Sequence, residues 1–425
     1  MSFTPKAITG IINQPVSSAV IITYRVGEVS LNLARVAAQV GNMVARLKAN
    51  REEKQKHLQQ ALDILQTSDF DDLKTKIASS RTTWLVAGLV DGLDSHYKPP
   101  PTPAEFTILA TDGSHIDVDR HRSTRCYLIN IGSVVLHYGD SPNATLDSFP
   151  CLYSGDEDLV IAPVGAKGRE QLIEGTLLGI KRSVDECHQL VKLASELPPS
   201  SSSLALLDGS LILWGLEAYP EFVAEALLDK GFLSYLNEIR KLSHDKRLAL
   251  ASYISFPRST DVVNTLRVAL CPHDPPDCDR YCPANENREC DKVAGIQDRE
   301  LFLNLLSRGE RSALFISQSS IVQKRYGGHR VYFFYLRLDD EIARVEIPQW
   351  VAIDESRLSL AHSLVLDQCQ RGQGYPVALS EAHEQAVVTA ADRENFWQLV
   401  ESSLVEEHLP TLTSAKRFSK KTRWV

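Results

Sequence analysis

The sequence predicts an α/β protein, because segments typical of strands and of helices alternate along most of its 425 residues. Short apolar runs typical of buried strands, residues 106–110 and 204–207, each lead into an Asp-Gly-Ser step. Between them, residues 169–197 have the apolar spacing of a long helix that ends at two prolines. We therefore expect a mixed sheet flanked by helices.

The remaining segments divide the chain into three regions. Apolar residues recur near helical spacing over residues 29–94, and four prolines follow in residues 98–103, which predicts a helical N-terminal extension over residues 1–100. An α/β domain is expected over residues 105–395, followed by a C-terminal helix and basic tail over residues 396–425. Further strands are predicted at residues 127–131, 134–138, 248–254, 331–338 and 343–347, and further helices at residues 221–242, from about Asp261 onward, and in the C-terminal region.

Composition places the chain among globular proteins. It is 43% hydrophobic and 24% charged, which excludes a collagen, a coiled coil and global disorder. No apolar run approaches the roughly 18 residues of a membrane-spanning helix, and the opening MSFTPKAITG lacks the pattern of an export signal. We expect a cytoplasmic protein without a membrane partner.

The net charge of −8 normally disfavours nucleic-acid binding, which depends on clustered basic side chains. Carboxylates gathered around divalent cations would also make a nuclease acidic overall. Five basic residues near the C-terminus form either a DNA-contacting patch or a solvated tail: Lys416, Arg417, Lys420, Lys421 and Arg423.

The two Asp-Gly-Ser steps carry the first candidate site. Asp112 and Asp208 each follow an apolar strand, and neighbouring strands lie about 4.8 Å apart, so the two carboxylates could share one or two divalent cations. Such cations assist phosphodiester cleavage and prefer hard oxygen ligands. The alternative is that each step is a turn, in which Asp and Ser have capping roles.

Several longer motifs resemble those of the NurA family of DNA nucleases. They are TILATDGSHID, REQLIEGTLLGIKRS, LALLDGSLILWGLE, SYISFPRSTDVVNTLR, FFYLRLDDEIARVEIPQWV and YPVALSEAHEQAVVT, and their order and spacing agree over about residues 105 to 395. The resemblance implies a ribonuclease H-like fold, dependence on Mn²⁺ or Mg²⁺, and 5′-to-3′ exonuclease and single-strand endonuclease activity on DNA. It also implies a homodimer that resects double-strand breaks with a hexameric HerA-type ATPase.

The resemblance assigns catalytic and metal-binding roles to Asp112, Glu174, Asp208 and His383. Glu174 is expected on the helix, where neighbouring leucines supply an apolar face; the alternative is an exposed helix charge. His383 matches a family histidine and would bind metal, or orient water and phosphate. Its alternative is a capping or packed histidine.

A phosphate-binding group is predicted where a strand meets the helix beyond Pro257. Tyr253, Arg258 and Ser259 lie there, and amides at a helix start together with Arg258 could hold a phosphate. The alternative is that Pro257 and Ser259 only begin the helix. Glu346 is assigned to strand packing or to a salt bridge with Arg344, outside the site.

Half of the eight cysteines lie in an insertion at residues 271–290. Cys271, Cys278, Cys282 and Cys290 would suit a structural Zn²⁺ or an iron-sulfur cluster in a reducing compartment. Their spacing matches no standard paired motif, and unligated cysteines in a solvated loop are the alternative.

Two functions follow from these patterns. The first is a two-metal deoxyribonuclease. The second is a non-catalytic DNA-binding adaptor subunit of a motor ATPase. The chain has no GxxxxGK[ST] phosphate loop, so an energy source would have to be a partner.

Overall fold

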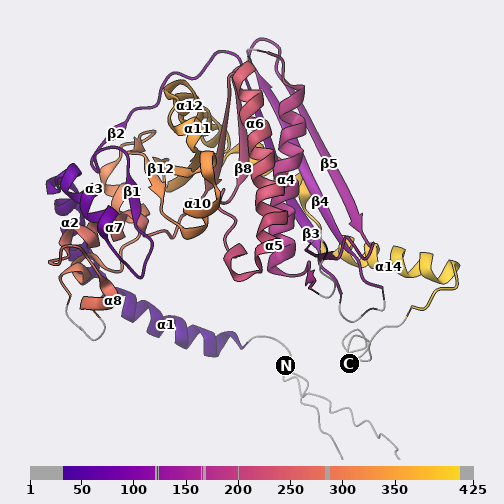
Figure 1. The fold of residues 1–425 in the computed structure, drawn as a ribbon, viewed down its shortest axis with the longest axis horizontal. Helices are drawn as coiled ribbons and strands as arrows, with labels where there is room; N and C mark the ends of the chain where they lie inside the picture. Colours follow the sequence, from indigo (N-terminus) through magenta and orange to yellow (C-terminus); the bar gives the residue numbers. More distant parts are fainter. Residues whose placement is uncertain are drawn as a thin grey trace, which may run out of the picture. The chain divides into compact units, whose positions relative to one another are not determined.

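The computed structural model describes residues 32–119, 122, 124–163, 165, 169–199, 201–282 and 288–411 (Figure 1). The predicted basic tail from Lys416 to Arg423 lies outside these residues. The chain divides into two compact units, Met1–Lys56 and His57–Val425. Within the first, helix α1 (Leu33–Ala49) begins at Asn32, whose side chain accepts a hydrogen bond from the Arg35 amide at 3.1 Å.

Five strands form the centre of the second unit. Strands β3 (Phe106–Ile116), β4 (Tyr127–Tyr138) and β5 (Asn143–Tyr153) make an antiparallel meander. Strand β8 (Ser203–Asp208) pairs parallel with β3, and β9 (Leu248–Ile254) pairs parallel with β8. The order β5-β4-β3-β8-β9, with three antiparallel strands followed by two parallel ones, is the ribonuclease H-like arrangement.

Further strands extend this sheet beyond β9. The order continues through β13 (Ile342–Pro348), β12 (Val331–Arg337), β11 (Phe315–Ser317) and β1 (Ala87–Leu89), all antiparallel. Two short strands, β10 (Arg311–Ser312) and β2 (His96–Tyr97), complete an 11-stranded sheet within the described chain. A separate pair consists of β6 (Val160–Ile161) and β7 (Gln171–Leu172).

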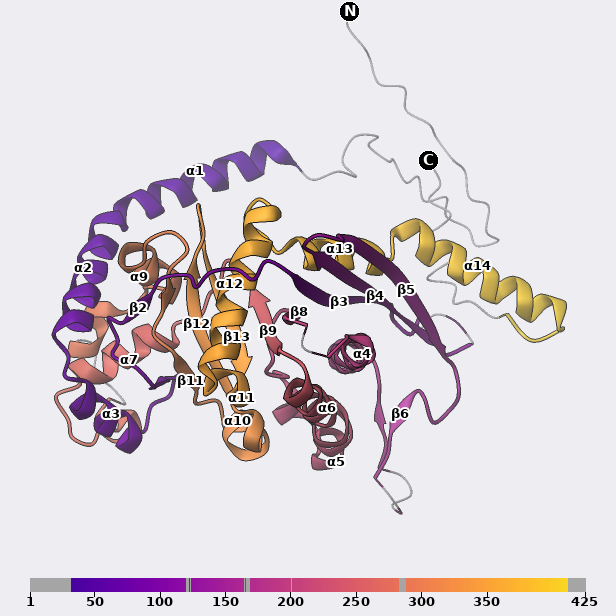
Figure 2. The same ribbon diagram turned by 90° about the horizontal axis from the view of Figure 1, so that it is seen from above.

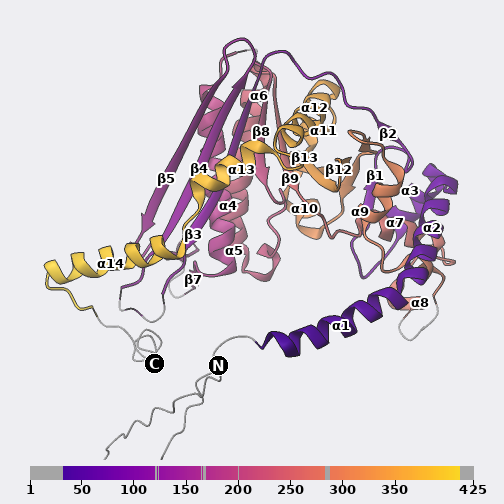
Figure 3. The same cartoon turned by 180° about the vertical axis from the view of Figure 1, so that it is seen from behind.

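Helices cover both faces of the central strands. Helices α4 (Thr176–Glu196) and α6 (Leu233–Asp245) pack on one face, and α12 (Glu355–Arg371) and α13 (Val377–Ala386) pack on the other (Figures 2 and 3). Burial from both sides explains why β8 contains an uninterrupted apolar run, LALL, before Asp208. The remaining helices are α2 (Arg51–Thr67), α3 (Phe70–Ser79), α5 (Glu221–Ala224), α7 (Asp261–Leu270), α8 (Cys278–Tyr281), α9 (Asp298–Leu305), α10 (Ser320–Arg325), α11 (Gln349–Ala352) and α14 (Ala390–Glu406), with short 3₁₀ turns at Leu216–Ala218, Glu289–Val293 and Gly327–His329 and a π-helical stretch at Glu225–Phe232.

Three sequence predictions require correction. The helical prediction for residues 29–94 is wrong after Ser79, because β1 joins the sheet by pairing with β11. The helix predicted from Arg169 begins at Thr176, since β7 forms first. The two strands predicted at residues 127–131 and 134–138 are one strand, because Gly132 continues the ladder with partners on both sides. The other predicted strands, and the helix beginning at Asp261, are confirmed.

No helix in the described part of the chain is both long and apolar enough to cross a lipid bilayer.

Candidate active site

The sheet register brings the two Asp-Gly-Ser aspartates side by side. The last paired residues of β3 and β8 are Thr111 and Leu207, so Asp112 and Asp208 follow on neighbouring strands. Adjacent residues of parallel strands share a face and lie about 4.8 Å apart across the ladder. The prediction that Asp208 ends its strand is confirmed. The same prediction for Asp112 is wrong, because β3 continues to Ile116 through pairing with β4.

Two side chains of the first Asp-Gly-Ser step make hydrogen bonds to α13. Asp112 Oδ2 lies 2.7 Å from Nδ1 of His383 on α13, and Ser114 Oγ donates to the Ala386 carbonyl at the end of that helix. Asn130 of β4 donates to the same carbonyl at 2.9 Å. Because an ionised carboxylate only accepts hydrogen bonds, His383 Nδ1 is the donor. The histidine side chain is 63% exposed, so it is not a packed core histidine.

Asp208 is held by a tyrosine from the loop before α13. Tyr375 donates its hydroxyl to Asp208 Oδ1 at 3.0 Å, and the Tyr375 ring packs edge-on against Tyr253 with centroids 5.4 Å apart. The side chain of Asp208 reaches solvent on one side, yet desolvation by surrounding protein atoms raises its pKa. The negative charge of Asp112 adds to this increase, and the hydrogen bond from Tyr375 opposes it.

A third carboxylate, Glu186 of α4, approaches through the space left by Gly113. Glu186 Oε1 lies 2.6 Å from the position that a Cβ on Gly113 would occupy, so a larger residue there would displace it. The pKa of Glu186 is raised to about 8, mainly by burial; the charge of Arg182 opposes this increase, and the charges of Asp112 and Asp208 contribute to it. The contact at Gly113 thus places Glu186 next to Asp112, and its carboxylate interacts electrostatically with both aspartates.

The environment of Glu186 leaves its charge incompletely compensated. Arg182 Nε lies 3.0 Å from Glu186 Oε1, but the two atoms are not aligned as a hydrogen bond. Glu186 Oε1 is therefore a buried carboxylate oxygen without a hydrogen-bond partner among the described residues. Burying such an oxygen costs folding free energy unless a cation or a proton compensates its charge.

Glu174 lies elsewhere. It precedes α4, and the neighbouring Gly175 amide donates to Asp117 beyond the end of β3 at 3.2 Å. An α-helix rises about 1.5 Å per residue, so Glu186 is roughly 15 Å along α4 from its first turn. The structure therefore brings Glu186, and not Glu174, to the pair of aspartates.

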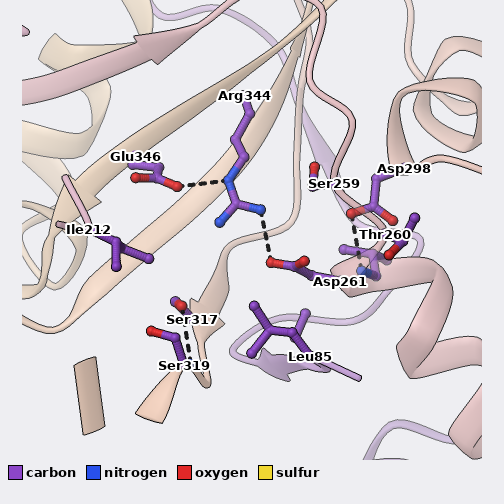
Figure 4. Close-up of polar contacts among 12 residues, drawn as sticks. Leu85, Ile212, Ser259, Thr260, Asp261, Asp298, Ser317, Ser319, Arg344 and Glu346 are labelled. Atoms are coloured by element: carbon purple, nitrogen blue, oxygen red, sulfur yellow. Dashed lines mark hydrogen bonds and ion pairs between the residues drawn. The ribbon is translucent and has the colours of Figure 1, made fainter. Parts of the chain in front are cut away.

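The turn after Asp208 is held by Glu346, which also forms a buried ion pair with Arg344; Figure 4 shows Arg344 between Glu346 and Asp261. Ser210 Oγ donates to Glu346 Oε2 at 2.8 Å, and the Leu211 amide donates to the same oxygen at 2.9 Å. Arg344 Nε donates to Glu346 Oε1 at 2.9 Å, as the sequence analysis expected, and its Nη1 donates to Asp261 at 2.9 Å. Glu346 thus lies outside the carboxylate cluster but anchors the loop that carries Asp208.

The predicted phosphate-binding group is largely occupied by internal contacts. Asp298 accepts hydrogen bonds from the Val262 and Val263 amides at the start of α7, where the phosphate was expected. Tyr253 is fully buried and donates its hydroxyl to Glu341 and to the Gly374 carbonyl, and Ser259 Oγ is 2.8 Å from the Tyr335 hydroxyl. Arg258 alone of the predicted trio is exposed.

The cysteines of the insertion lie near one another without forming a closed site. Cys271 follows α7, Cys278 and Cys282 are separated by one turn of α8, and Cys290 lies in the following 3₁₀ turn. Burial raises the pKa of Cys278, and the other three thiols raise it further. All four are free thiols.

The donors of the candidate active site suit a hard divalent cation. Asp112, Glu186 and Asp208 supply carboxylate oxygens, and the unpartnered oxygen of Glu186 would be stabilised by a positive charge. In the described part of the chain, no three Asp, Glu, His or Cys side chains are close enough to hold one ion, so a shared ion would need these side chains to rotate.

Comparison with known proteins identifies the family. The family model of the NurA domain matches residues 106–388, which include every strand and helix that carries these carboxylates. The chain belongs to the NurA family. NurA proteins are nucleases that act in DNA end processing, so the carboxylate cluster lies within a nuclease domain. No curated protein matches the chain.

Sequence reasoning missed Glu186 and Tyr375. Glu186 was detectable in principle, since it is a charged residue on the apolar face of α4, between Val184 and Leu190. Tyr375 opens the motif YPVALSEAHEQAVVT, but the motif did not reveal its partner, because the hydrogen bond to Asp208 joins residues 167 apart.

Gly132 is expected to tolerate no side chain, because α13 packs directly on it. A Cβ there would lie 2.2 Å from the Ala382 carbonyl oxygen, and backbone atoms cannot move aside as a flexible side chain can. We expect Gly132→Ala to destabilise the protein by about 1–3 kcal/mol and to lower activity, because α13 carries His383. Urea unfolding and a cleavage assay would measure both effects.

Gly179→Ala on α4 is the matched control, since nothing lies within 4 Å of the position that a Cβ on Gly179 would occupy. That variant should be stabilised by up to about 1 kcal/mol. Equal stability of Gly132→Ala and the natural protein would contradict the packing described for α13.

Proposed function

We propose that this protein is a metal-dependent deoxyribonuclease that resects DNA ends in double-strand break repair. The observation that supports this most directly is the approach of three carboxylates, Asp112, Glu186 and Asp208, at the centre of a ribonuclease H-like sheet. We assign the third ligand to Glu186 in place of Glu174. From family membership we propose two specific activities, a 5′-to-3′ exonuclease activity and a single-strand endonuclease activity.

The ligands we assign to Mn²⁺ or Mg²⁺ are these three carboxylates, with His383 beside Asp112. When bound, such ions neutralise the phosphate and lower the pKa of an attacking water. Asp112 fixes the orientation of the His383 ring through Nδ1, which directs Nε2 away as a ligand or a proton acceptor. Tyr375 and the Glu346 anchor keep Asp208 in place.

Substrate contacts outside the carboxylate cluster are also part of the proposal. Arg258 is exposed beyond β9 and is suited to hold a DNA phosphate. We also propose that the four cysteines of the insertion bind a structural Zn²⁺ or iron-sulfur cluster after small movements. Metal analysis of protein purified without oxygen would test this, and the absence of near-stoichiometric zinc or iron would rule it out.

A homodimer and a hexameric HerA-type ATPase complete the proposal. Strand β5 supports the dimer, because it is an edge strand of 11 residues exposed along nearly its whole length. Leu146, Phe149 and Leu152 are exposed on it by 39%, 41% and 52%. A long exposed edge with apolar side chains favours pairing with another chain.

The test is cleavage of end-labelled linear and single-stranded DNA by the purified protein with Mn²⁺, Mg²⁺ or EDTA. Digestion that requires the divalent cation supports the nuclease. No digestion under any condition, including addition of a HerA-type ATPase, would support the non-catalytic adaptor instead.

A further inference from the structure

An open cavity of about 850 Å³ lies beside the candidate active site. Tyr375 lines it and also donates a hydrogen bond to Asp208, so the cavity adjoins one of the metal-binding carboxylates. Phe256, Arg308 and Arg337 are on its wall, together with the amide side chains of Gln370 and Gln373. Its position makes it available to a part of the substrate next to the cleaved bond.

Phe256 has an unusual backbone conformation in this wall. Its φ is +45°, in the left-handed region that bulky side chains rarely adopt. The following residue, Pro257, favours an extended conformation at Phe256, so the local sequence opposes this φ as well. Strain of this kind persists where surrounding contacts enforce it, and it is concentrated at functional sites.

Arg299 of α9 supplies contacts that hold Phe256. The guanidinium carbon of Arg299 lies 3.5 Å from the centroid of the Phe256 ring, and Nη1 donates to the Phe256 carbonyl at 3.3 Å. Although Arg299 stacks on the ring, Phe256 is 58% exposed. The result is an aromatic ring supported by a cation and turned to solvent.

Single exposed hydrophobic side chains are common on protein surfaces and need no special explanation. Phe256 differs because its exposure coincides with a strained backbone and a stacked arginine. It also comes three residues after Tyr253, which is the register partner of Asp208. An aromatic face at that position is suited to stacking a nucleobase, since every base has a π face.

The charges of the cavity favour a base over a phosphate. Arg308 and Arg337 are opposed by Asp339, Asp340 and Glu341 on the same wall. The ion pair between Arg308 and Asp339, at 3.5 Å, is highly exposed at both ends and therefore weak. With three carboxylates against two guanidinium groups, the wall does not attract a phosphodiester strongly, whereas a neutral base can enter.

We propose that Phe256 is a stacking platform for an unpaired nucleobase of the DNA strand that is held at Asp112 and Asp208. This inference rests on the proposed nuclease function and specifies its substrate as a strand with unpaired bases at the site. Phe256 binds and positions the strand. It does not take part in the chemical step.

The test uses the full-length protein and a short single-stranded DNA that contains 2-aminopurine, with Ca²⁺ in place of Mn²⁺ or Mg²⁺ so that a cation is present at the carboxylates while cleavage is minimised. Stacking on Phe256 should quench the 2-aminopurine fluorescence. Phe256→Ala should abolish the quenching and weaken binding roughly tenfold, while Phe256→Trp should retain both. Ile353→Ala, which removes a side chain that is 69% exposed outside the cavity, is the matched control.

A second measurement does not depend on the folding of a variant. The natural protein should bind an oligonucleotide with an abasic nucleotide at the quenched position roughly tenfold more weakly than the intact strand. Unchanged binding and quenching in Phe256→Ala, or unchanged binding of the abasic strand, would overturn the inference while cleavage of DNA by the natural protein persists. A protein that neither binds nor cuts DNA would overturn the proposed function as well.

Discussion

Asp112→Asn and Asp208→Asn are each expected to lower the rate of DNA cleavage by about a hundredfold or more. Each substitution removes one negative charge and one oxygen ligand from the site where the metal is proposed to act, and metal stabilisation of phosphate chemistry amounts to several kcal/mol. The fold should be retained. Asparagine has nearly the same shape, and at position 208 its carbonyl can still accept the hydrogen bond of Tyr375.

Initial rates on end-labelled linear and single-stranded DNA, with Mn²⁺ or Mg²⁺, would measure the loss, and thermal unfolding would check the fold. Asp140→Asn is the matched control, because Asp140 is an exposed aspartate in the turn between β4 and β5. If a variant at Asp112 or Asp208 kept at least half of the natural rate, that residue would not belong to the catalytic site.

Glu186→Gln is expected to reduce cleavage to a similar degree, whereas Glu174→Gln should leave it nearly unchanged. The charge of Glu186 interacts with both aspartates, while Glu174 lies before α4, near Asp117. Binding of Mn²⁺ should stabilise the natural protein and the Glu174 variant against unfolding. It should stabilise the Glu186 variant much less. The reverse pattern, with activity lost only at Glu174, would restore the assignment made from sequence.

The raised pKa of Glu186 also predicts how pH affects the metal-free protein. In the unfolded chain the carboxyl ionises near its ordinary pKa of 4.5, whereas in the folded protein it stays protonated up to about 8. The stability that this group contributes is therefore fully present below pH 4.5 and is lost as the pH rises to about 8. The slope in that window is at most about 1.4 kcal/mol per pH unit.

Glu186→Gln should remove this slope, so in EDTA at pH 8 to 9 the inactive variant should be more stable than the natural protein. Urea unfolding at a series of pH values would measure the difference. Identical pH dependence of the two proteins would show that the Glu186 carboxylate is not destabilised by burial, and that its oxygen has a partner.

Much of the central sheet is predictable from sequence, because its strands are short apolar runs between turn residues. The strand ending at Asp208, the strand at residues 248–254 and the helix beginning at Asp261 appear where local patterns place them. Where prediction fails, long-range pairing is the cause. β1 is only three residues long, and it forms by pairing with β11, more than 200 residues later in the same chain. β5 is exposed, and it forms by pairing with β4.

The sequence by itself determined that two aspartates follow apolar strands in Asp-Gly-Ser steps and that a family histidine lies near the C-terminus. These features are local in the chain, so spacing and residue type are enough to find them. Only the tertiary structure decided which glutamate joins the aspartates. A helix places its residues along an axis, and the register of α4 against Gly113 brings Glu186 to the site. Glu174 precedes α4, whose first turn lies roughly 15 Å along the helix axis from Glu186.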